Sequence, residues 1–302
     1  MLNSKQTLIN DVNEILKVDE VLPWAIEGLT LMRSSQPSLR QPVVYQPSIY
    51  LVLQGSKRAY LEDDIYNYDA FNYLVLTVPL PIEAHIIQAS QSKPYLALRL
   101  DIDLDIVREL LENMHGDQKH DKENSRGIYI SPIEDELLNG FCRLMALSHS
   151  QDENFENNQR ILVPMIKKEI FYHVLCGKQG GLLKAIAQGQ RQQAKISQAI
   201  HFIQKHIDQP LDVQNLAKGA NMSVSSFHQY FKDITGFPPL QYIKTLRLHL
   251  AKRLLLQDGY SISEAAYQVG YSSASQFSRE YKRLFNMSPS TAWGAQVGEQ
   301  VD

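Results

Sequence analysis

The sequence has little cysteine and no long apolar run. Cys142 and Cys176 are the only cysteines among 302 residues, so a disulfide framework or a cysteine-rich metal site is not expected, and both thiols are interpreted as structural. The most apolar stretch, residues 73–82, is short and contains Pro79 and Pro81, so it is not predicted to span a bilayer. Residues 1–17 lack the apolar block of a secretory signal. A membrane is therefore not expected among the partners.

Charge is distributed unevenly along the chain. The formal net charge is −3, yet residues 191–302 carry 12 Lys and Arg against 8 Asp and Glu, while residues 1–190 carry 18 against 25. A mildly basic C-terminal part on an acidic remainder fits attraction to phosphate that is confined to one module.

A short pattern occurs twice near the C-terminus, in residues 216–232 and 265–282. Ala217 and Ala266 are offset by 49 residues and Phe227 and Phe277 by 50, so the second copy carries one extra turn residue. Each copy predicts a helix, a tight turn and a second helix, the arrangement that places a helix in a DNA groove.

Capping residues support the predicted helix starts. Asp212 can cap the first helix of the first copy, and Ser261 with Glu264 forms a capping box in the second. Ser273, with Gln276 three residues later, predicts another capping box at the start of the last helix.

The two turns require a residue that tolerates positive φ, and the helices require a buried face. Gly270 supplies that freedom in the second copy, and Asn221 is the next most tolerant choice at the matching place in the first. Aromatic residues four apart predict the buried face of each second helix: Phe227 and Phe231, then Phe277 and Tyr281.

The residues between these aromatics should face outward, where they can reach a major groove. Arginine can bind guanine, glutamine can bind adenine, and serine, histidine or lysine can donate to bases or phosphates. The predicted DNA-binding residues are Ser225, Ser226, His228, Gln229 and Lys232 in the first copy and Ser275, Gln276, Ser278, Arg279 and Lys282 in the second. A helix over about 240–257, ended by Gly259, joins the copies.

These features resemble the AraC/XylS-type transcriptional regulators. The likeness extends from about residue 196 to 289 and rests on Thr235–Pro239, on Thr245–Leu248 with the following Ala251 and Leu254–Leu255, and on Asn286–Pro289. The resemblance implies two helix-turn-helix units on a linking helix. It places six residues at the family's groove-reading positions: Ser225, His228, Gln229, Ser275, Ser278 and Arg279. Asn286 stands where the family usually has glycine.

Residues 27–100 predict short strands with proline or polar breaks. The expected strands are 48–54, 58–61, 73–78, 83–87 and 95–100, which suggests an antiparallel barrel or sandwich. Pro47–Arg58, Tyr66–Asp69, Leu80–Pro81 and Pro94–Leu98 resemble the cupin-like N-terminal domain of one branch of these regulators. The resemblance implies a domain that senses a small molecule or a partner.

Candidate effector-binding residues are cations that could pair with an anionic ligand and aromatic rings that could line a pocket. They are Tyr50, Lys57, Tyr60, Tyr68, His85 and Arg99. Because side chains alternate between the faces of a strand, the sequence does not say which of them point inward.

The alternative is a cupin-type metal-dependent enzyme that carries a degenerate helical tail. Catalytic cupins need a clustered His-x-His with a further Glu and His, and His85 is the only histidine in the strand region. No catalytic residue, metal or cofactor is therefore expected, and the regulator is preferred over the enzyme.

The predicted fold is α+β with two domains. Residues 1–180 form a cupin-like antiparallel β-barrel with flanking helices over 104–114, 133–147 and from about Pro164 to Gly177; residues 181–192 form a linker; residues 193–302 form the all-α DNA-binding domain. The expected partners are double-stranded promoter or operator DNA, a small-molecule effector, a second copy bound through the helical segment, and RNA polymerase. A purely intramolecular role for that segment is the other interpretation. The expected location is the bacterial cytoplasm, at the nucleoid.

Overall fold

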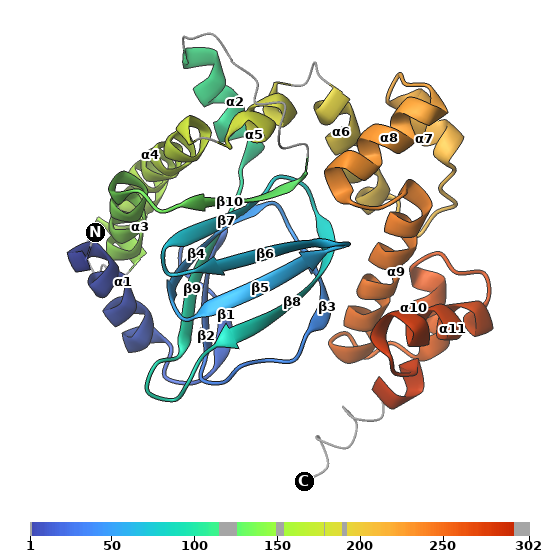
Figure 1. The fold of residues 1–302 in the computed structure, drawn as a ribbon, viewed down its shortest axis with the longest axis horizontal. Coiled ribbons are helices and arrows are strands. Elements are labelled where there is room, and N and C mark those ends of the chain that lie inside the picture. Colours follow the sequence, from blue (N-terminus) through green and yellow to red (C-terminus); the bar gives the residue numbers. More distant parts are fainter. Residues whose placement is uncertain (1, 115–125, 149–153, 178, 189–191, 293–302) are drawn as a thin grey trace.

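The structure is a computed structural model that describes residues 2–114, 126–148, 154–177, 179–188 and 192–292. Its N-terminal half is built from antiparallel strands (Figure 1). These are β1 (Glu20–Pro23), β2 (Leu29–Ser34), β3 (Gln41–Tyr45), β4 (Ser48–Gln54), β5 (Ser56–Leu61), β6 (Asp64–Asp69), β7 (Asn72–Leu76), β8 (Leu80–Gln88), β9 (Tyr95–Asp101) and β10 (Ile128–Pro132).

The strands form two sheets that face each other. The larger has the order β1-β2-β9-β4-β7-β10 and the smaller the order β3-β8-β5-β6, with antiparallel pairing throughout. The predicted antiparallel β domain is confirmed. Pro81, expected to interrupt a strand, is instead the second residue of β8 and lies opposite Val44 of β3. β1, β2, β3, β6 and β10 were not among the strands expected from sequence.

Alternation along β4 separates two hydrophobic cores. Tyr50 and Val52 point into the core between the sheets, together with Leu61 and Tyr68 of the smaller sheet. Ile49 and Leu51 point the other way, into a second core that the helices cover. Both faces of the larger sheet are therefore buried, which explains why β4 has a nearly continuous apolar sequence.

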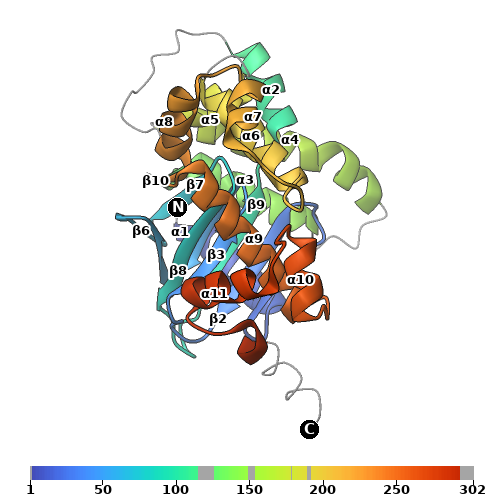
Figure 2. The same ribbon diagram turned by 90° about the vertical axis from the view of Figure 1, so that its right-hand side faces the viewer.

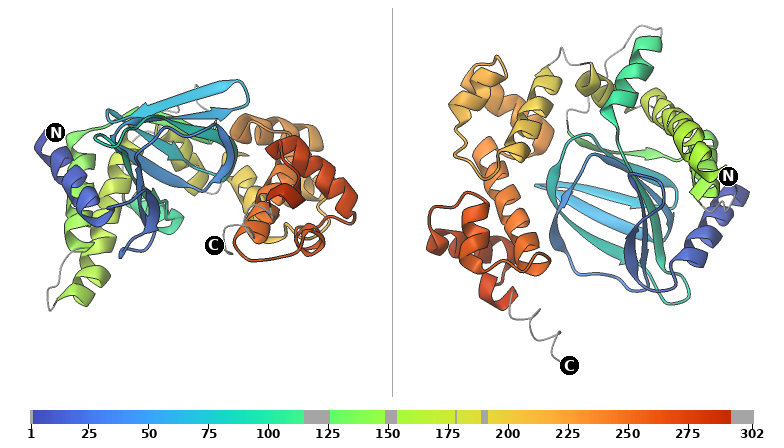
Figure 3. Two further views of the ribbon diagram at one scale, coloured as in Figure 1. Left: turned by 90° about the horizontal axis from the view of Figure 1, so that it is seen from below. Right: turned by 180° about the vertical axis from the view of Figure 1, so that it is seen from behind.

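Helices cover the outer face of the larger sheet, as Figures 1 and 3 show. They are α1 (Leu2–Ile15), α2 (Leu104–Asn113), α3 (Asp135–Ser148) and α4 (Phe155–Cys176). The helices predicted over 104–114 and 133–147 are confirmed within one or two residues, but the prediction for Pro164 is wrong. Pro164 lies inside the 22-residue helix α4, not near its first turn.

The segment predicted as a linker contains a buried helix. α5 (Gly181–Ala187) occupies most of residues 181–192, and Leu182, Leu183 and Ile186 are buried. Its side chains join both hydrophobic cores of the N-terminal half. Residues 189–191 lie outside the described part of the chain.

The C-terminal half is helical and lies beside β3 and β8, on the side of the β domain opposite α1, α3 and α4 (Figures 1 and 2). Its helices are α6 (Gln192–Lys205), α7 (Val213–Gly219), α8 (Val224–Thr235), α9 (Pro239–Leu256), α10 (Ile262–Gln268) and α11 (Ala274–Phe285). The first unit shares a continuous apolar core with the barrel, whereas the second unit has a core of its own.

Candidate functional site

Both repeated units form the predicted helix, turn and helix. α7 and α8 make the first unit, α10 and α11 the second, and they lie towards opposite ends of α9 (Figures 1 and 2). Asp212 caps α7 by accepting from the amide of Asn215 at 3.1 Å, and Ser223 caps α8. Ser261 and Glu264 form the predicted capping box at α10. Each such cap stabilises its helix start by about 1 kcal/mol.

The capping box predicted at α11 is incomplete. The Ser273 hydroxyl accepts from the amide of Gln276 at 3.3 Å, but the Gln276 side chain donates to Glu280 at 3.1 Å instead of returning to the cap. Glu280 also accepts from the Tyr271 hydroxyl at 2.8 Å and lies 3.4 Å from the ammonium of Lys244. Burial opposes the charge on Glu280, but these partners outweigh it, so the Glu280 pKa lies below its ordinary value.

The turn residues adopt the predicted left-handed conformation. Asn221 has φ 51° and Gly270 has φ 82°. Asn286, which follows α11 where the family usually has glycine, has φ 57°. Asparagine accepts this conformation at a small cost because its short polar side chain bonds locally.

The predicted aromatic faces are buried. Phe227, Phe231, Phe277 and Tyr281 have no exposed surface. The Phe231 ring packs edge-on against Tyr242 of α9, with ring centroids 5.2 Å apart. Each second helix is thus anchored by one face, which leaves the opposite face for a ligand.

That opposite face carries the predicted DNA-binding residues. Nine of the ten are exposed, and Ser278 is half-buried. Ser226 takes part in the α8 cap, where it accepts from the Ser223 hydroxyl at 2.9 Å. The polar faces of α8 and α11 are therefore open to solvent, as groove-reading helices require.

The glutamine of each reading helix is bonded to an acidic residue one turn later. Gln229 donates to Asp233 at 2.8 Å, and Gln276 donates to Glu280 at 3.1 Å. A bidentate contact with adenine uses both the amide oxygen and the amide nitrogen. Either glutamine would have to release its present bond, or use its second N–H, to make that contact.

Sequence reasoning missed one cation on the second reading helix. Arg283 is exposed in the last turn of α11, next to Lys282. Its position one turn after Arg279 could have revealed it, because residues four apart share a helix face.

The end of the first reading helix is attached to the barrel. The amide of Gly127 donates to the carbonyl of Ile234 at 2.7 Å, and the guanidinium of Arg126 donates to the carbonyl of Lys232 at 2.9 Å. Arg126 also donates to Asp64 of β6 at 3.1 Å. The orientation of α8 is therefore linked to the N-terminal half of the chain.

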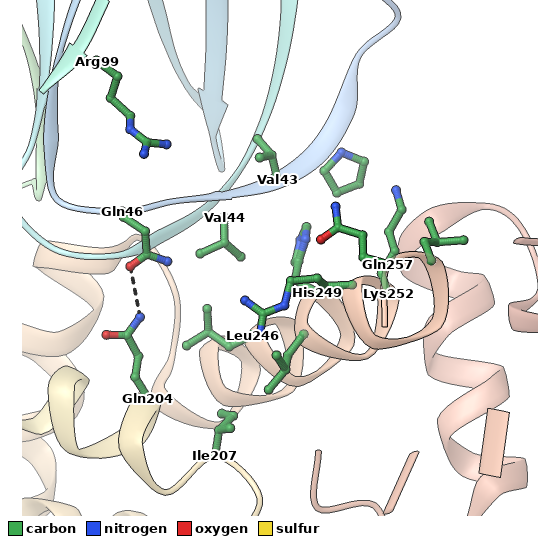
Figure 4. Close-up of a pocket in the computed structure, with 14 residues that line it drawn as sticks. Val43, Val44, Gln46, Arg99, Gln204, Ile207, Leu246, His249, Lys252 and Gln257 are labelled. Carbon is green, nitrogen blue, oxygen red and sulfur yellow. Dashed lines mark hydrogen bonds between the residues drawn. The ribbon is translucent and has the colours of Figure 1, made fainter. Parts of the chain in front are cut away.

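A cavity of about 830 Å³ lies between the barrel and α9 (Figure 4). The side chains that line it come from the β3 region, from Arg99 of β9, from Gln204 and Ile207, and from one face of α9. They are Pro42, Val43, Val44, Gln46, Arg99, Gln204, Ile207, Leu246, His249, Leu250, Lys252, Arg253, Leu256 and Gln257. The Gln204 amide donates to Gln46 at 3.3 Å across one end of the cavity.

The lining combines apolar side chains with cations. Lys252 and Arg253 contribute positive charge, as does Arg99, whose Nε pairs with Asp101 at 3.0 Å. None of the described lining residues is acidic. Burial and the neighbouring Lys252 lower the pKa of His249 to about 4, so its imidazole is neutral near pH 7. The cavity is therefore suited to an anion with an apolar body. The sequence signal for this lining is the recurrence of basic residues and leucines on one face of α9.

The six predicted effector-binding residues do not form one site. Tyr50, Lys57 and Tyr68 meet inside the barrel around Tyr45: the Tyr45 and Tyr50 rings stack at 4.8 Å, the Tyr45 and Tyr68 hydroxyls are 3.3 Å apart, and the Lys57 ammonium lies 5.3 Å from the Tyr45 ring.

The other three predicted residues lie elsewhere. Tyr60 and His85 stack at 5.7 Å on the opposite face of the smaller sheet, because they alternate with the inward-facing Ala59 and Ala84. Only Arg99 lines the large cavity.

Neither a metal site nor a membrane segment is evident in the described residues. Within those residues, no group of three or more His, Cys, Asp and Glu side chains is arranged to hold a metal ion. Among the described helices, none combines the length and apolar character needed to cross a bilayer.

Comparison with known proteins identifies the family. Residues 25–182 match the model of the AraC-type transcriptional regulator N-terminus, and residues 216–292 match a helix-turn-helix domain. The chain belongs to the AraC-type transcriptional regulators. Membership of this family favours the regulator over the enzyme alternative.

Curated relatives match about a third of this AraC-type chain. The probable transcriptional regulator LumQ of Photobacterium leiognathi is 36% identical over 89 residues, which are 30% of this chain and 36% of LumQ. The HTH-type transcriptional activator RhaS of Salmonella schwarzengrund is 31% identical over 96 residues, 32% of this chain and 34% of RhaS. The chain thus spans about a third of the length of these relatives.

Solved structures share the whole two-domain fold. Apo ToxT from Vibrio cholerae superposes with a TM-score of 0.59 at 15% identity, covering 91% of this chain and 100% of ToxT. ToxT bound to an unsaturated fatty acid superposes equally well, at 0.59 and 16% identity, covering 90% of this chain and 95% of ToxT. At this identity the likeness shows the fold alone, and it confirms the predicted β domain followed by a helical domain.

Proposed function

We propose that this protein is a sequence-specific, effector-responsive transcriptional regulator that docks α8 and α11 in adjacent major grooves of double-stranded DNA. The proposal rests on the duplicated unit. α8 and α11 are both capped, each buries a face of aromatic side chains, and each exposes a polar face. Within this function Arg279 is the principal base reader, and Lys232, Lys282 and Arg283 bind phosphates. The remaining predicted DNA-binding residues contribute contacts along the two faces.

Selection of bound sequences from random duplex DNA by the full-length protein tests this function. We expect recovered sites to contain two short sequence elements, one for each reading helix. Binding should weaken steeply as salt rises, because phosphate contacts release counterions. Recovery of random sequence, or of a single element, would count against two reading helices.

The effector is proposed to be an amphipathic anion bound in the cavity between the barrel and α9. Three cations and several aliphatic side chains line this space without an acidic residue, which suits a carboxylate on an apolar chain. The structural relative ToxT has been solved with an unsaturated fatty acid bound. Because the cavity is lined from both halves of the chain, a ligand there would favour one arrangement of the two halves over another.

A second copy of the chain is proposed to bind along α4. Ile161, Leu162, Met165 and Tyr172 are exposed apolar side chains on this helix, and their spacing places them along one side. Such a stripe is unfavourable in water and favours burial against an identical stripe. Sedimentation of the full-length protein should show a dimer, and Met165→Glu should sediment as a monomer. A Met165→Glu variant that still sediments as a dimer would show that α4 does not form the interface.

The remaining expectations complete the proposal. Residues 1–180 serve as the regulatory domain, residues 181–192 as the connection and residues 193–302 as the DNA-binding domain. RNA polymerase is the proposed partner at a promoter, and the bacterial cytoplasm, at the nucleoid, is the proposed location.

A further inference from the structure

One side chain of the connecting helix binds both the loop that leads into the first helix-turn-helix unit and the turn of the second unit. The Nε of Arg247 donates to the carbonyl of Ile207 at 2.9 Å, and its Nη2 donates to the carbonyl of Gln209 at 2.6 Å. Its Nη1 donates to the carbonyl of Gly270 at 3.3 Å. The first two acceptors lie in the loop between α6 and α7, and the third lies in the turn of the second unit.

The same two loops touch each other directly. A Cβ atom added at Gly270 would lie 2.6 Å from the carbonyl oxygen of Asp208 and 2.9 Å from Nη2 of Arg247. Glycine is therefore required at this turn for close approach as well as for its φ of 82°. The turn before α11 packs against the loop that leads into the first unit.

Further contacts extend this connection to the reading helix. Glu280 of α11 accepts from the hydroxyl of Tyr271, which directly follows Gly270, and Glu280 also faces Lys244 of α9. A continuous set of polar contacts thus joins the loop at residues 207–209, Arg247, the turn at residues 270–271 and α11.

The apolar cores do not supply this connection. Among the described residues, Leu246 packs with the core of the first unit and the barrel, whereas Leu248 packs with the separate core of the second unit. Each unit packs on α9 through its own core, and the two cores are separate. The contacts of Arg247, between Leu246 and Leu248 in the chain, add polar restraints that connect the loop before α7 to the turn of the second unit.

We propose that Arg247 is a positioning residue that holds α8 and α11 in one relative placement and so determines which spacing between the two DNA elements the protein accepts. The proposal rests on the proposed function. One base pair added between the elements moves them apart by about 3.4 Å and rotates one against the other by about 35°. A rigid pair of units cannot follow both changes, whereas a loosened pair can.

Binding of full-length protein to a panel of duplexes tests this role. Each duplex carries the selected site with the segment between its two elements shortened or lengthened by one or two base pairs. Arg247→Gln removes the fork that reaches three carbonyls. Lys205→Gln is the matched control, because it removes one positive charge from an exposed position at the end of α6. Thermal unfolding shows which variants are folded, and Arg247→Lys, which keeps the charge but not the fork, provides a second variant.

For the natural protein and Lys205→Gln, we expect a one-base-pair change to lower affinity about tenfold. For Arg247→Gln this penalty should shrink to below about threefold, with Arg247→Lys in between. Equal weakening of Arg247→Gln at every spacing would overturn the positioning role. If the natural protein prefers its selected site but tolerates every spacing, the positioning role is also overturned, while the proposed function remains. If the natural protein shows no sequence preference at all, the proposed function is refuted.

Discussion

The hydroxyl of Tyr242 donates a hydrogen bond of 2.7 Å to the carbonyl oxygen of Pro79, and this bond joins the helix between the two reading units to the barrel. Tyr242 has no exposed surface, and its ring packs against Phe231 of α8. Its side chain therefore links the connecting helix, to which it belongs, to the N-terminal half and to the first reading helix. The two halves of the chain meet through a buried polar contact as well as through a shared apolar core.

Tyr242→Phe should destabilise the protein because it leaves the buried carbonyl of Pro79 without this donor. The expected loss is about 1–3 kcal/mol in the free energy of unfolding. Urea unfolding measures it, and Tyr267→Phe, which removes a hydroxyl from a tyrosine that is 62% exposed, should change little. Equal values for the two variants would mean that the bond contributes nothing to the contact between the halves.

The two turn residues should respond differently to substitution. Gly270→Ala forces a side chain into a positive φ and against the carbonyl of Asp208, so it should cost about 2 kcal/mol or more. Asn221→Gly should change stability by less than about 1 kcal/mol, because φ 51° suits both residues.

Gly219→Ala is the matched control for these turn variants. Gly219 ends α7, and a Cβ there meets no atom within 4 Å, so alanine should stabilise the helix by about 0.5–1 kcal/mol. Thermal unfolding should rank Gly219→Ala as the most stable of the three variants, Asn221→Gly next and Gly270→Ala as the least stable. A Gly270→Ala protein as stable as the natural one would show that the two loops can separate freely.

His249 should make stability depend on pH. Its pKa in the folded protein is about 4, below the ordinary 6.5. As pH falls from about 6.5 to about 4, the unfolded chain takes up a proton that the folded chain does not, so the free energy of unfolding decreases across this window by at most about 3 kcal/mol. Well above pH 6.5 the group is neutral in both states and contributes no pH dependence.

Urea unfolding between pH 4 and 7 tests this effect. His249→Phe should lose the His249 part of the slope, whereas replacement of the exposed His228 by alanine should retain it. Identical slopes for His249→Phe and the natural protein would show that His249 is protonated as readily in the folded chain as in the unfolded one.

Removal of a cavity cation should weaken binding of an amphipathic anion. Arg253 is exposed at the cavity and should pair with a carboxylate, so Arg253→Gln should raise the Kd for oleate about tenfold. Titration calorimetry measures this, with Arg160→Gln on α4 as the charge-matched control and oleate methyl ester as the uncharged ligand. Equal affinity of Arg253→Gln and Arg160→Gln for oleate would argue against an anion site. So would a natural protein that binds oleate no more tightly than its methyl ester.

Local features of this fold could be predicted from sequence, and contacts between distant segments could not. The caps at Asp212 and Ser261 and the turns at Asn221 and Gly270 depend on neighbouring residues, and the structure confirms them. The cavity depends on β3 meeting α9, about two hundred residues apart, which no local pattern reports.

Two further features depend on context that local patterns do not contain. Pro164 fits inside α4, although proline is more common in the first turn of a helix. The core that the first unit shares with the barrel joins residues far apart in the sequence, so the caps and turn residues of that unit do not reveal it.

Affinity of the full-length protein for its selected site and for unrelated DNA, with Arg279→Ala and Lys282→Ala measured in parallel, tests the central claim most directly. We expect the natural protein to prefer its site by at least about a thousandfold. Arg279→Ala should lose about 1–3 kcal/mol of that preference, because a base contact is specific. Lys282→Ala should weaken binding to both DNAs alike, because a phosphate contact does not depend on the base sequence. Equal affinity of the natural protein for both DNAs would contradict the account.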